Sequence, residues 1–481
     1  MQPLTKITDV LWELPLTYKA GMRVCGRVYA SEAMLRHIVG DNCLEQVANV
    51  ACLPGIQQYS LAMPDIHWGY GFPIGGVAAT APDEGGVISP GGVGYDINCG
   101  VRLMRTQLSR EDVAPKIHDL VSQLFRDIPC GLGEKSDLRL ARDDERQVLV
   151  QGARWAVKRG FGKADDLEFI EEGGCMAEAE SSNITERALE RGAGQVGSLG
   201  SGNHFLEVQV VDEIFDDTAA QTMGLFLGGV TVMIHCGSRG FGYQVCDDYL
   251  RVLGRAPEKY GFRLPDRQLA SAPIQSPEGQ EYLAAMRCAA NYAFANRQVL
   301  AAKAERSFLH ALGISPNALG MELVYDVPHN IAKFEEHMIN GRPRRVCVHR
   351  KGATRSFPPN HPSVPARYRA VGQPVLVPGD MGRYSFVLAG QPQAMAQTFG
   401  TVCHGAGRVM SRSQAKRELN FDQLRRDMEQ RGVVMMARGR GTAVEEASAA
   451  YKDVAEVVNV VDAAGLAKKV CRMRPIGVVK G

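Results

Sequence analysis

The spacing of apolar residues along the chain predicts several helices. In the clearest case they recur every three or four positions, as on one face of an amphipathic helix within 112–126: Ile117, Leu120, Val121, Leu124 and Phe125. A second stretch, 280–312, contains no Gly or Pro and is rich in Ala, so we expect one long helix that ends at Gly313. The same criteria predict three further helical segments: 412–429, 444–457 and Ile331–His337.

Short runs of apolar and β-branched residues between these segments predict strands: Val101–Thr106, Phe205–Val211, Val230–His235, Glu322–Val327, Arg345–Arg350 and Pro374–Val377. The strands and helices do not alternate in the regular order that a doubly wound sheet requires. We therefore predict an α+β fold. Because no repeat or flexible linker divides the chain, we expect one large mixed α/β unit spanning 1–481. The segment 352–372, rich in Pro and Arg, is predicted to be a surface loop.

The composition is that of a soluble globular protein. The 55 Lys and Arg nearly balance the 53 Asp and Glu, and the net charge of +2 excludes a broadly basic nucleic-acid coat, though not a local basic groove. Two uncharged stretches, Thr218–Ser238 and Tyr384–Gly407, have the length of a membrane span, but Gly and Pro interrupt them. The 12 cysteines form no Cys-x-x-Cys pair, and the N-terminus lacks the apolar core of a signal peptide. We expect a cytoplasmic protein with reduced thiols.

Glycine is over-represented and unevenly placed. The chain has 52 glycines in 481 residues, well above the usual share of about 7%. Most glycine clusters lie close to a His, Cys, Asp or Asn: a run at 91–94 precedes Asp96, and Gly405 to Gly407 follow His404. Because glycine allows positive φ and close approach of the backbone, these clusters predict loops around a metal or a phosphate. Ordinary turns are the alternative.

Five residues with metal-binding side chains lie at or near the ends of predicted elements. Asp96 and Cys99, three positions apart in a loop, can both turn onto one ion, and a thiolate can bridge two ions. His204, His235 and His329 stand beside loops, where ligands are usually placed. Such a set suits a transition metal such as Mn²⁺, Zn²⁺, Fe²⁺ or Co²⁺. Taken alone, each histidine is more readily a structural residue, because the set is scattered along the chain.

A second constellation surrounds His404. A Gly-rich turn follows this histidine and leads into a predicted helix, and a helix N-terminus after glycines is a natural anion site. His404 is therefore a phosphate-binding group, an acid–base group or a covalent nucleophile, and Cys403 is the competing nucleophile unless it is buried. Four cations, each a surface charge when taken alone, can together line a groove for a polyanion: Arg239, Lys351, Arg408 and Arg412.

Six longer motifs carry a resemblance to a known family: Asp96-Ile-Asn-Cys-Gly100, Gly200-Ser-Gly-Asn-His-Phe-Leu-Glu207, His235-Cys-Gly-Ser-Arg-Gly240, Pro328-His-Asn330, Pro378-Gly-Asp-Met-Gly382 and His404-Gly-Ala-Gly-Arg408. In this order they resemble the RtcB family of RNA ligases. The likeness runs from Met63-Pro-Asp-Ile-His67 to Val479-Lys-Gly481, which is nearly the whole chain.

The resemblance implies a single RtcB-type domain with a central pocket for metal and nucleotide. It implies two Mn²⁺ ions, GTP, and the joining of RNA ends bearing a 3′-phosphate or 2′,3′-cyclic phosphate to 5′-hydroxyl ends in tRNA splicing or RNA repair. Asp96, Cys99 and His204 would bind one ion, and Cys99 would bridge to a second held by His235 and His329. It leaves open whether an archease-type activator is needed.

The resemblance also implies catalytic and nucleotide-binding residues. His404 would take GMP covalently, with Cys99 and Asn203 as further catalytic groups; Asn203 would contact phosphate. The guanosine would be surrounded by five residues: Phe205, Glu207, Ser385, Tyr451 and Lys480. The other motif residues expected at the nucleotide are His329, Asn330, Pro378, Gly379, Asp380, Met381, Gly405, Ala406 and Gly407. Glu207 suits guanine because a carboxylate accepts from both N1–H and the 2-amino group, which adenine cannot match.

Two other functions stay open beside the ligase hypothesis. A metal-dependent phosphohydrolase or cyclic phosphodiesterase would use the same ions without GTP. A non-catalytic RNA-binding paralogue would keep the metal only for folding, although all five proposed ligands and His404 are present. The sequence does not determine the physiological RNA, the preferred phosphate end or the oligomeric state.

Overall fold

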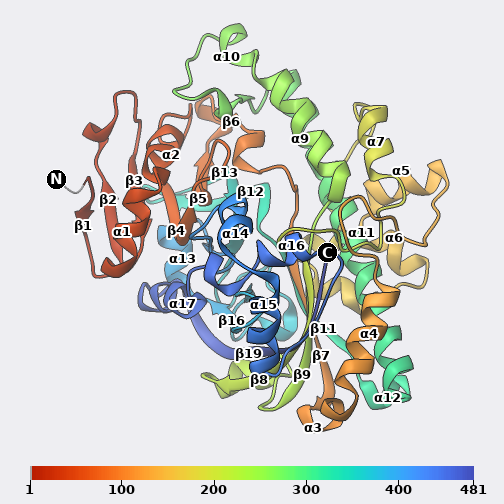
Figure 1. Ribbon diagram of the computed structural model, residues 1–481. Helices are drawn as coiled ribbons and strands as arrows, with labels where there is room; N and C mark the ends of the chain where they lie inside the picture. Colours follow the sequence, from red (N-terminus) through yellow and green to blue (C-terminus); the bar gives the residue numbers. More distant parts are fainter. Residues whose placement is uncertain (1–2) are drawn as a thin grey trace.

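The structure, a computed structural model, describes residues 3–481 and confirms a mixed α+β fold (Figure 1). A seven-stranded sheet has the order β1-β2-β3-β4-β5-β13-β12 and is antiparallel except between β3 and β4. Its strands are β1 (Thr5–Lys6), β2 (Leu11–Leu14), β3 (Cys25–Tyr29), β4 (Tyr59–His67), β5 (Ile74–Thr80), β12 (Asn330–Ile339) and β13 (Arg342–Lys351). Helices α1 (Glu32–Gly40), α2 (Cys43–Val50) and α17 (Val454–Ala463) share its apolar core.

An eight-stranded sheet carries the other half of the molecule. Its order is β11-β7-β9-β8-β19-β16-β15, all antiparallel, and β18 pairs with β19 in parallel. The strands are β7 (Gly100–Ser109), β8 (Phe205–Ile214), β9 (Gly229–Cys236), β11 (Glu322–Pro328), β15 (Pro374–Val377), β16 (Ser385–Gly390), β18 (Val434–Ala437) and β19 (Ala467–Lys480). Two short pairs complete the strands: β6 (Val87–Ile88) with β10 (Ala272–Pro273), and β14 (Ala353–Arg355) with β17 (Thr401–Cys403).

The long helix α11 (Pro277–Leu312) lies against the eight-stranded sheet. Ser276 caps its start by accepting a hydrogen bond from Gly279 N at 3.2 Å, and Gly313 ends it with φ +68°, a conformation that glycine adopts without strain. Figure 1 shows it among the helices on the right. It packs against α4 (Ile117–Asp127), α5 (Arg142–Gln151), α6 (Ala153–Lys158) and α9 (Arg239–Leu253).

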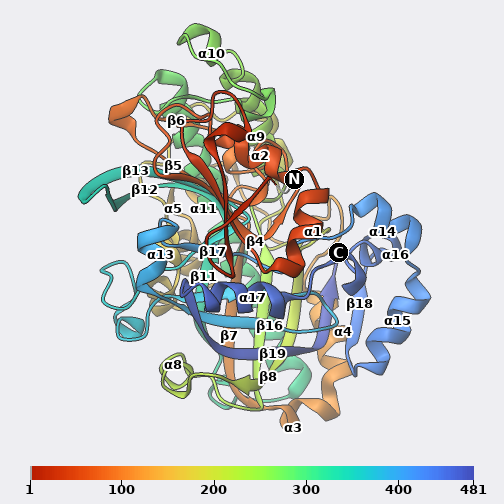
Figure 2. The same ribbon diagram turned by 90° about the vertical axis from the view of Figure 1, so that its left-hand side faces the viewer.

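The remaining helices are short. They are α3 (Arg110–Val113), α7 (Glu186–Gly192), α8 (Asp217–Thr222), α10 (Ala256–Lys259), α12 (Pro316–Leu319), α13 (Pro392–Gln397), α14 (Arg412–Glu418), α15 (Phe421–Gln430) and α16 (Arg440–Val444). Figure 2 shows α14, α15 and α16 gathered around β18, at the side opposite the β12–β13 hairpin. None of the helices within residues 3–481 is long and apolar enough to cross a membrane.

The predicted strands and the long helix are confirmed, whereas the shorter helices are only partly right. All six predicted strands are present, and the helix predicted over 280–312 begins three residues earlier. The segment 112–126 is broken before Ile117, where a 3-10 turn holds Pro115, and 412–429 is two helices because Asn420 caps a new start by accepting from Asp422 N and Gln423 N. The helix predicted over 444–457 is wrong: α16 ends at its start and α17 begins only at Val454.

Of two further predictions, one is wrong and one is only partly right, because strand pairing overrides local pattern. Ile331–His337 is not helical but belongs to β12, which pairs along its whole length with β13. In the predicted loop 352–372, the first residues form the buried strand β14, paired with β17. That pairing matters for the site, because His404 directly follows β17.

Candidate metal and nucleotide site

The metal-type residues meet because four of them stand at one end of the eight-stranded sheet. In the antiparallel register, Gly100 at the start of β7 lies opposite Cys236 at the end of β9 and Pro328 at the end of β11. Phe205 at the start of β8 lies opposite His235. The three other donors each lie one residue outside a strand, and they therefore meet His235 at the same end of the strands: Cys99, His204 and His329.

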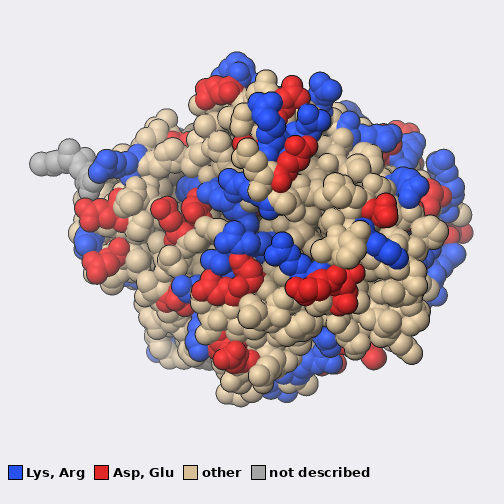
Figure 3. All heavy atoms as spheres, turned by 60° about the horizontal axis from the view of Figure 1, so that its bottom comes forward, with Lys and Arg blue, Asp and Glu red and all other residues tan. Residues whose placement is uncertain are grey.

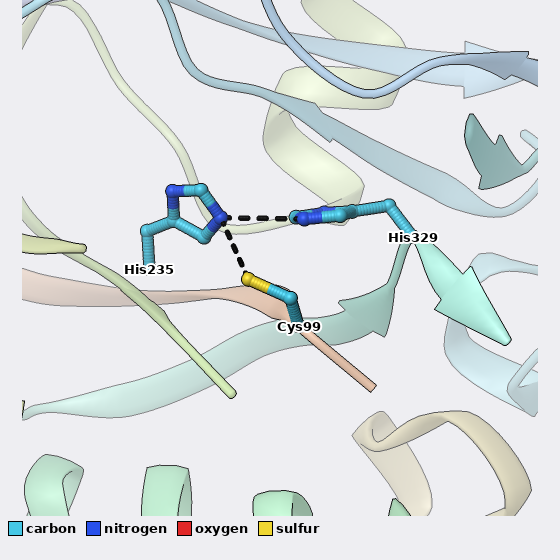
Figure 4. A group of neighbouring side chains, drawn as sticks. All are labelled: Cys99, His235 and His329. Carbon is cyan, nitrogen blue, oxygen red and sulfur yellow. Dashed lines mark hydrogen bonds between the residues drawn. The ribbon is translucent and has the colours of Figure 1, made fainter. Parts of the chain in front are cut away.

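Two groups of three donors share the Cys99 thiol. In each group, Cys99 with His235 and His329 or Cys99 with Asp96 and His204, the ligand atoms lie within 4.8 Å of one another. Cys99 Sγ is 3.2 Å from His235 Nε2, which is 3.3 Å from His329 Nε2 (Figure 4). On the other side, His204 Nε2 lies 3.4 Å from the sulfur and 2.8 Å from Asp96 Oδ2. This donor chemistry fits two transition-metal ions that share one sulfur.

The protonation of these groups suits a metal. Burial lowers the pKa of His235 and of His329 well below the ordinary value, so both rings are neutral and can donate a lone pair. Burial also raises the pKa of the Cys99 thiol to about 12, so a cation that binds there must displace a proton. His204 Nδ1 donates to the Leu199 carbonyl at 3.0 Å, which turns its Nε2 toward Asp96 and Cys99. Although burial lowers the pKa of His204, the nearby Cys236, Cys99 and Asp96 raise it well above the ordinary value, so an ion that binds Nε2 must displace a proton there too.

His404 lies beside the metal ligands and is held by a buried carboxylate. Its ring centre is 4.7 Å from that of His329. Asp65 Oδ2 accepts hydrogen bonds from His404 Nδ1 at 2.6 Å, from His404 N at 3.0 Å and from Gly405 N at 3.4 Å. Because Asp65 keeps a proton on Nδ1, Nε2 has a free lone pair and can act as a nucleophile.

A cavity of about 1200 Å³ joins these groups to the predicted nucleotide residues. All five predicted metal ligands and His404 line it. So do Asn203, Phe205, Glu207, Asn330, Pro378, Gly379, Asp380, Met381, Gly405, Ala406, Gly407, Tyr451 and Lys480. Ser385 and Cys403 do not: both are buried, and Cys403 lies within β17. The structure thus leaves His404 as the nucleophile candidate with access to the cavity.

Glu207 is a buried carboxylate in the wall of this cavity. Gln209 Nε2 donates to it at 2.7 Å and to Ser385 Oγ at 3.1 Å. Ser385 Oγ also accepts from Gly379 N at 3.2 Å, so Ser385 is linked to the cavity wall through both Gln209 and Gly379. Burial raises the pKa of Glu207 to about 8, against the opposing effect of Gln209 and the Lys480 ammonium. Without a ligand in the cavity, the Glu207 carboxyl group is therefore largely protonated below about pH 8.

Three of the four predicted cations line the cavity: Arg239, Arg408 and Arg412. Arg412 is half exposed and donates from Nη2 to Asn203 Oδ1 at 3.3 Å. Arg408 pairs with buried Glu446 at 3.2 Å, and Arg412 Nε lies 3.5 Å from the same carboxylate. Figure 3 shows Lys and Arg gathered in a band across one face of the molecule, with clusters of Asp and Glu beside it. A near-neutral chain therefore still presents locally basic surface.

Lys351 is the exception among the predicted cations. It is only 3% exposed, outside the cavity lining, and its ammonium donates to the main-chain carbonyls of Tyr70 and Phe72. Burial lowers its pKa to about 7. The structure therefore does not place Lys351 in the groove as predicted; it fastens the loop between β4 and β5.

Sequence reasoning missed two carboxylates at this site. Asp65 belongs to the Met63–His67 motif but received no role, although a charged residue inside the largely apolar strand β4 was a usable signal. Glu446, also buried, accepts from Tyr451 OH and Arg408 in the cavity wall. Glu446 lies in the segment 444–457, which was wrongly predicted as a helix, so its position in the cavity wall was not foreseen.

Known proteins match nearly the whole chain. A family model described as tRNA-splicing ligase RtcB matches residues 46–481. A tRNA-splicing ligase RtcB of Archaeoglobus fulgidus is 53% identical over 478 residues, 99% of each chain. The protein of the same name from Thermococcus kodakarensis is 54% identical over 481 residues, 100% of this chain and 99% of the relative. An RNA-splicing ligase RtcB of Mycobacterium tuberculosis is 53% identical over 438 residues, 91% of this chain and 100% of the relative.

Proposed function

Because the chain belongs to the RtcB family of tRNA-splicing ligases, we propose that it joins RNA ends bearing a 3′-phosphate or 2′,3′-cyclic phosphate to 5′-hydroxyl ends, using GTP. The observation that carries the proposal is His404, oriented by Asp65, beside two three-donor groups in one cavity. The reaction serves tRNA splicing or RNA repair in the cytoplasm. One cavity is lined by residues from His37 to Lys480. We therefore propose that the chain, 1–481, is a single domain.

In the first step, His404 Nε2 attacks the α-phosphorus of GTP. A P–N bond forms, the bond to the bridging oxygen breaks and pyrophosphate leaves, so His404 carries GMP. The ring gains positive charge as it attacks, and the Asp65 carboxylate at 2.6 Å from Nδ1 stabilises that charge. Asn203, with Arg412 Nη2 against its oxygen, directs its amide toward a phosphate.

In the next steps the guanylate passes to the RNA. An oxygen of the 3′-phosphate attacks the same phosphorus and the P–N bond breaks, which gives an RNA end activated by GMP through a pyrophosphate link. The 5′-hydroxyl then attacks the RNA phosphorus, a phosphodiester forms and GMP leaves. A cyclic phosphate is first opened by water. Arg239 and Arg412, on the cavity wall, provide cationic charge for the RNA phosphates.

The metal ions in this proposal are two Mn²⁺. Asp96, Cys99 and His204 would hold one, and Cys99, His235 and His329 the other. Bound ions supply the positive charge that stabilises phosphate oxygens during each displacement. A shared thiolate favours softer ions than Mg²⁺, in agreement with Mn²⁺.

Guanine specificity rests on the wall around Glu207. The ionised carboxylate accepts from N1–H and the 2-amino group of guanine, whereas adenine offers neither donor in that place. Phe205, Tyr451 and Lys480 line the same cavity, and Ser385 supports Glu207 through Gln209. A Cβ at Gly407 would clash with the Asp65 carbonyl oxygen, so glycine at this position lets the turn after His404 pack against β4.

The test is a joining assay with defined RNA halves, one ending in a 3′-phosphate and the other starting with a 5′-hydroxyl, with Mn²⁺ and with or without GTP. We expect joined product only with GTP, and a protein adduct from α-labelled GTP that maps to His404. Removal of the terminal phosphate without joining would contradict the proposal and favour a phosphohydrolase. Binding of RNA with neither reaction would favour a non-catalytic role.

Exchange of Asp65 for Asn is expected to slow formation of the GMP adduct by about 10²–10³-fold. Asparagine keeps the size of the side chain but carries no charge, and its amide can present an N–H to His404 Nδ1, which selects the wrong tautomer. The initial rate of labelling by GTP measures the effect. Glu171→Gln serves as the control, because Glu171 is also a buried carboxylate but pairs with Lys333 and does not line the cavity. Equal losses in both variants would show that Asp65 has no special role.

The affinity for guanosine is expected to depend on pH through Glu207. Since burial raises the pKa of Glu207 to about 8 and guanine needs the ionised form, affinity should fall about tenfold per unit as the pH drops below 8, and level off above it. Calorimetric titration with guanosine in the absence of metal, from pH 6 to pH 8.5, measures this. Glu207→Gln should bind more weakly and without the slope. A flat profile for the unmodified protein would contradict the assignment.

A further inference from the structure

Among the buried polar residues of the Ala-rich core helix α11 are Asn296 and Arg297, which are fully buried near its midpoint. Burying a guanidinium costs several kcal/mol unless its donors are all satisfied. A helix that only filled the core would hold apolar residues here, as it does at Ala295 and Val299. The partners of Asn296 and Arg297 show what they do.

Arg297 holds the backbone of two metal-ligand segments at once. Its Nη1 donates to the carbonyl of Asn98 at 2.7 Å and to the carbonyl of Cys236 at 2.9 Å, and its Nη2 donates to Asn98 Oδ1 at 3.0 Å. Asn98 precedes Cys99, and Cys236 follows His235. One rigid fork therefore fixes the spacing between two ligands that come from different strands.

The same guanidinium also reaches the strand of the third ligand. Its Nε and Nη2 donate to buried Asp326 at 3.0 and 2.8 Å, and Arg102 on β7 donates to the same carboxylate at 2.7 Å. Asp326 lies on β11, three residues before His329. Arg297 is thus linked to the segments that carry Cys99, His235 and His329, the three donors of one group.

Asn296 forms hydrogen bonds to the loop that leads to His204, a ligand of the second donor group. Its Oδ1 accepts from Gly197 N at 2.7 Å, and its Nδ2 lies 3.2 Å from both the Ser198 and the Gly237 carbonyl oxygens. The loop from Gly197 continues to His204, whose Nδ1 donates to the Leu199 carbonyl. Asn296 therefore mainly holds the loop that leads to His204, whereas Arg297 holds the segments of Cys99, His235 and His329.

We infer that Asn296 and Arg297 are positioning residues that set the distances among the ligands of both metal ions through the main chain, without touching an ion. The inference rests on the proposed metal binding but not on RNA joining. Lysine cannot replace this arginine, because an ammonium is a point charge and cannot donate along three fixed directions to two carbonyls and an amide. Outer partners of this kind are typically worth 10–100-fold in metal affinity.

The test is a titration of the metal-free full chain with Co²⁺, read by the thiolate-to-cobalt charge-transfer absorption from Cys99. For Arg297→Lys we expect Co²⁺ affinity to fall by about 10–100-fold, with a weaker charge-transfer band. For Asn296→Ala we expect the loss in the group of Asp96, Cys99 and His204, so that one ion still binds tightly. The control is Phe308→Ala, a buried apolar change on the same helix about 16 Å further along. It should lower the melting temperature and leave the affinity and spectrum unchanged.

Three outcomes would overturn the inference. The first is unchanged Co²⁺ affinity and spectrum in Arg297→Lys, and the second is the same loss of affinity in Phe308→Ala. The third is two intact metal sites in Asn296→Ala. If Arg297→Lys fails to fold, the Asn296→Ala variant alone tests the inference. A wild-type chain that binds Co²⁺ as described but forms no GMP adduct would contradict the proposed function and leave this inference standing.

Discussion

Replacement of His404 by Ala is expected to abolish the GMP adduct and to lower RNA joining on the order of 10⁶-fold, as when a covalent nucleophile is removed. His404 lines the cavity with its ring centre 4.7 Å from that of His329, and the Asp65 carboxylate on its Nδ1 leaves Nε2 free. Cys403 cannot take over, because it is buried and burial raises its pKa well above the ordinary value. Gel analysis of protein incubated with α-labelled GTP measures the adduct.

The same variant supplies its own control. If His404 acts only in the transfer of GMP, His404→Ala should still seal an RNA whose 3′-phosphate already carries GMP through a pyrophosphate link, since that step needs only the 5′-hydroxyl and the metal site. Sealing of the activated RNA with no labelling by GTP would locate the defect in the first step. Full labelling of His404→Ala would show that another residue is the nucleophile.

Replacement of Cys99 by Ser is expected to remove both ions rather than one. The Cys99 sulfur belongs to both donor groups, at 3.4 Å from His204 Nε2 and 3.2 Å from His235 Nε2, and a neutral hydroxyl is a poor substitute for a bridging thiolate. Metal content should fall from two ions per chain to none, joining should become undetectable, and added Mn²⁺ should no longer raise the melting temperature. Elemental analysis and thermal unfolding with and without Mn²⁺ measure these effects.

Cys347→Ser is the matched control for this change. Cys347 is equally buried, but it lies in β13 and does not line the cavity. This variant should keep both ions whatever its effect on stability. Loss of a single ion from Cys99→Ser would mean that the thiolate serves one site and that the two groups do not share it.

The two sheets contribute different parts of the site. The eight-stranded sheet brings the metal donors to one edge, where β7, β8, β9 and β11 begin or end. The seven-stranded sheet contributes Asp65 from β4. The short strand β17 ends just before His404 and places its ring against Asp65. Because neither sheet holds both His404 and the metal-type donors, these groups meet only in the cavity that residues of both sheets line.

The sequence by itself determined six of the strands, the long helix and the chemical character of the site. Strong local signals suffice for these: β-branched runs for the strands, an Ala-rich stretch closed by Gly313 for α11, and motifs of His, Cys, Asp and Gly for the donors. The motifs also pointed to the family. The roles assigned to individual residues stay predictions until the experiments above are done.

Only the tertiary structure decided which of these residues meet and what holds them. Ile331–His337 has a helical pattern, yet pairing with β13 makes it a strand, because ladder hydrogen bonds and burial outweigh a weak local preference. Lys351 and Arg412 are both basic residues. The buried Lys351 donates to backbone carbonyls, whereas Arg412 lines the cavity. Asp65 and Arg297 gain their roles from partners hundreds of positions away, such as His404 and Asn98. Contacts at that separation depend on sheet register and helix packing, which no local pattern encodes.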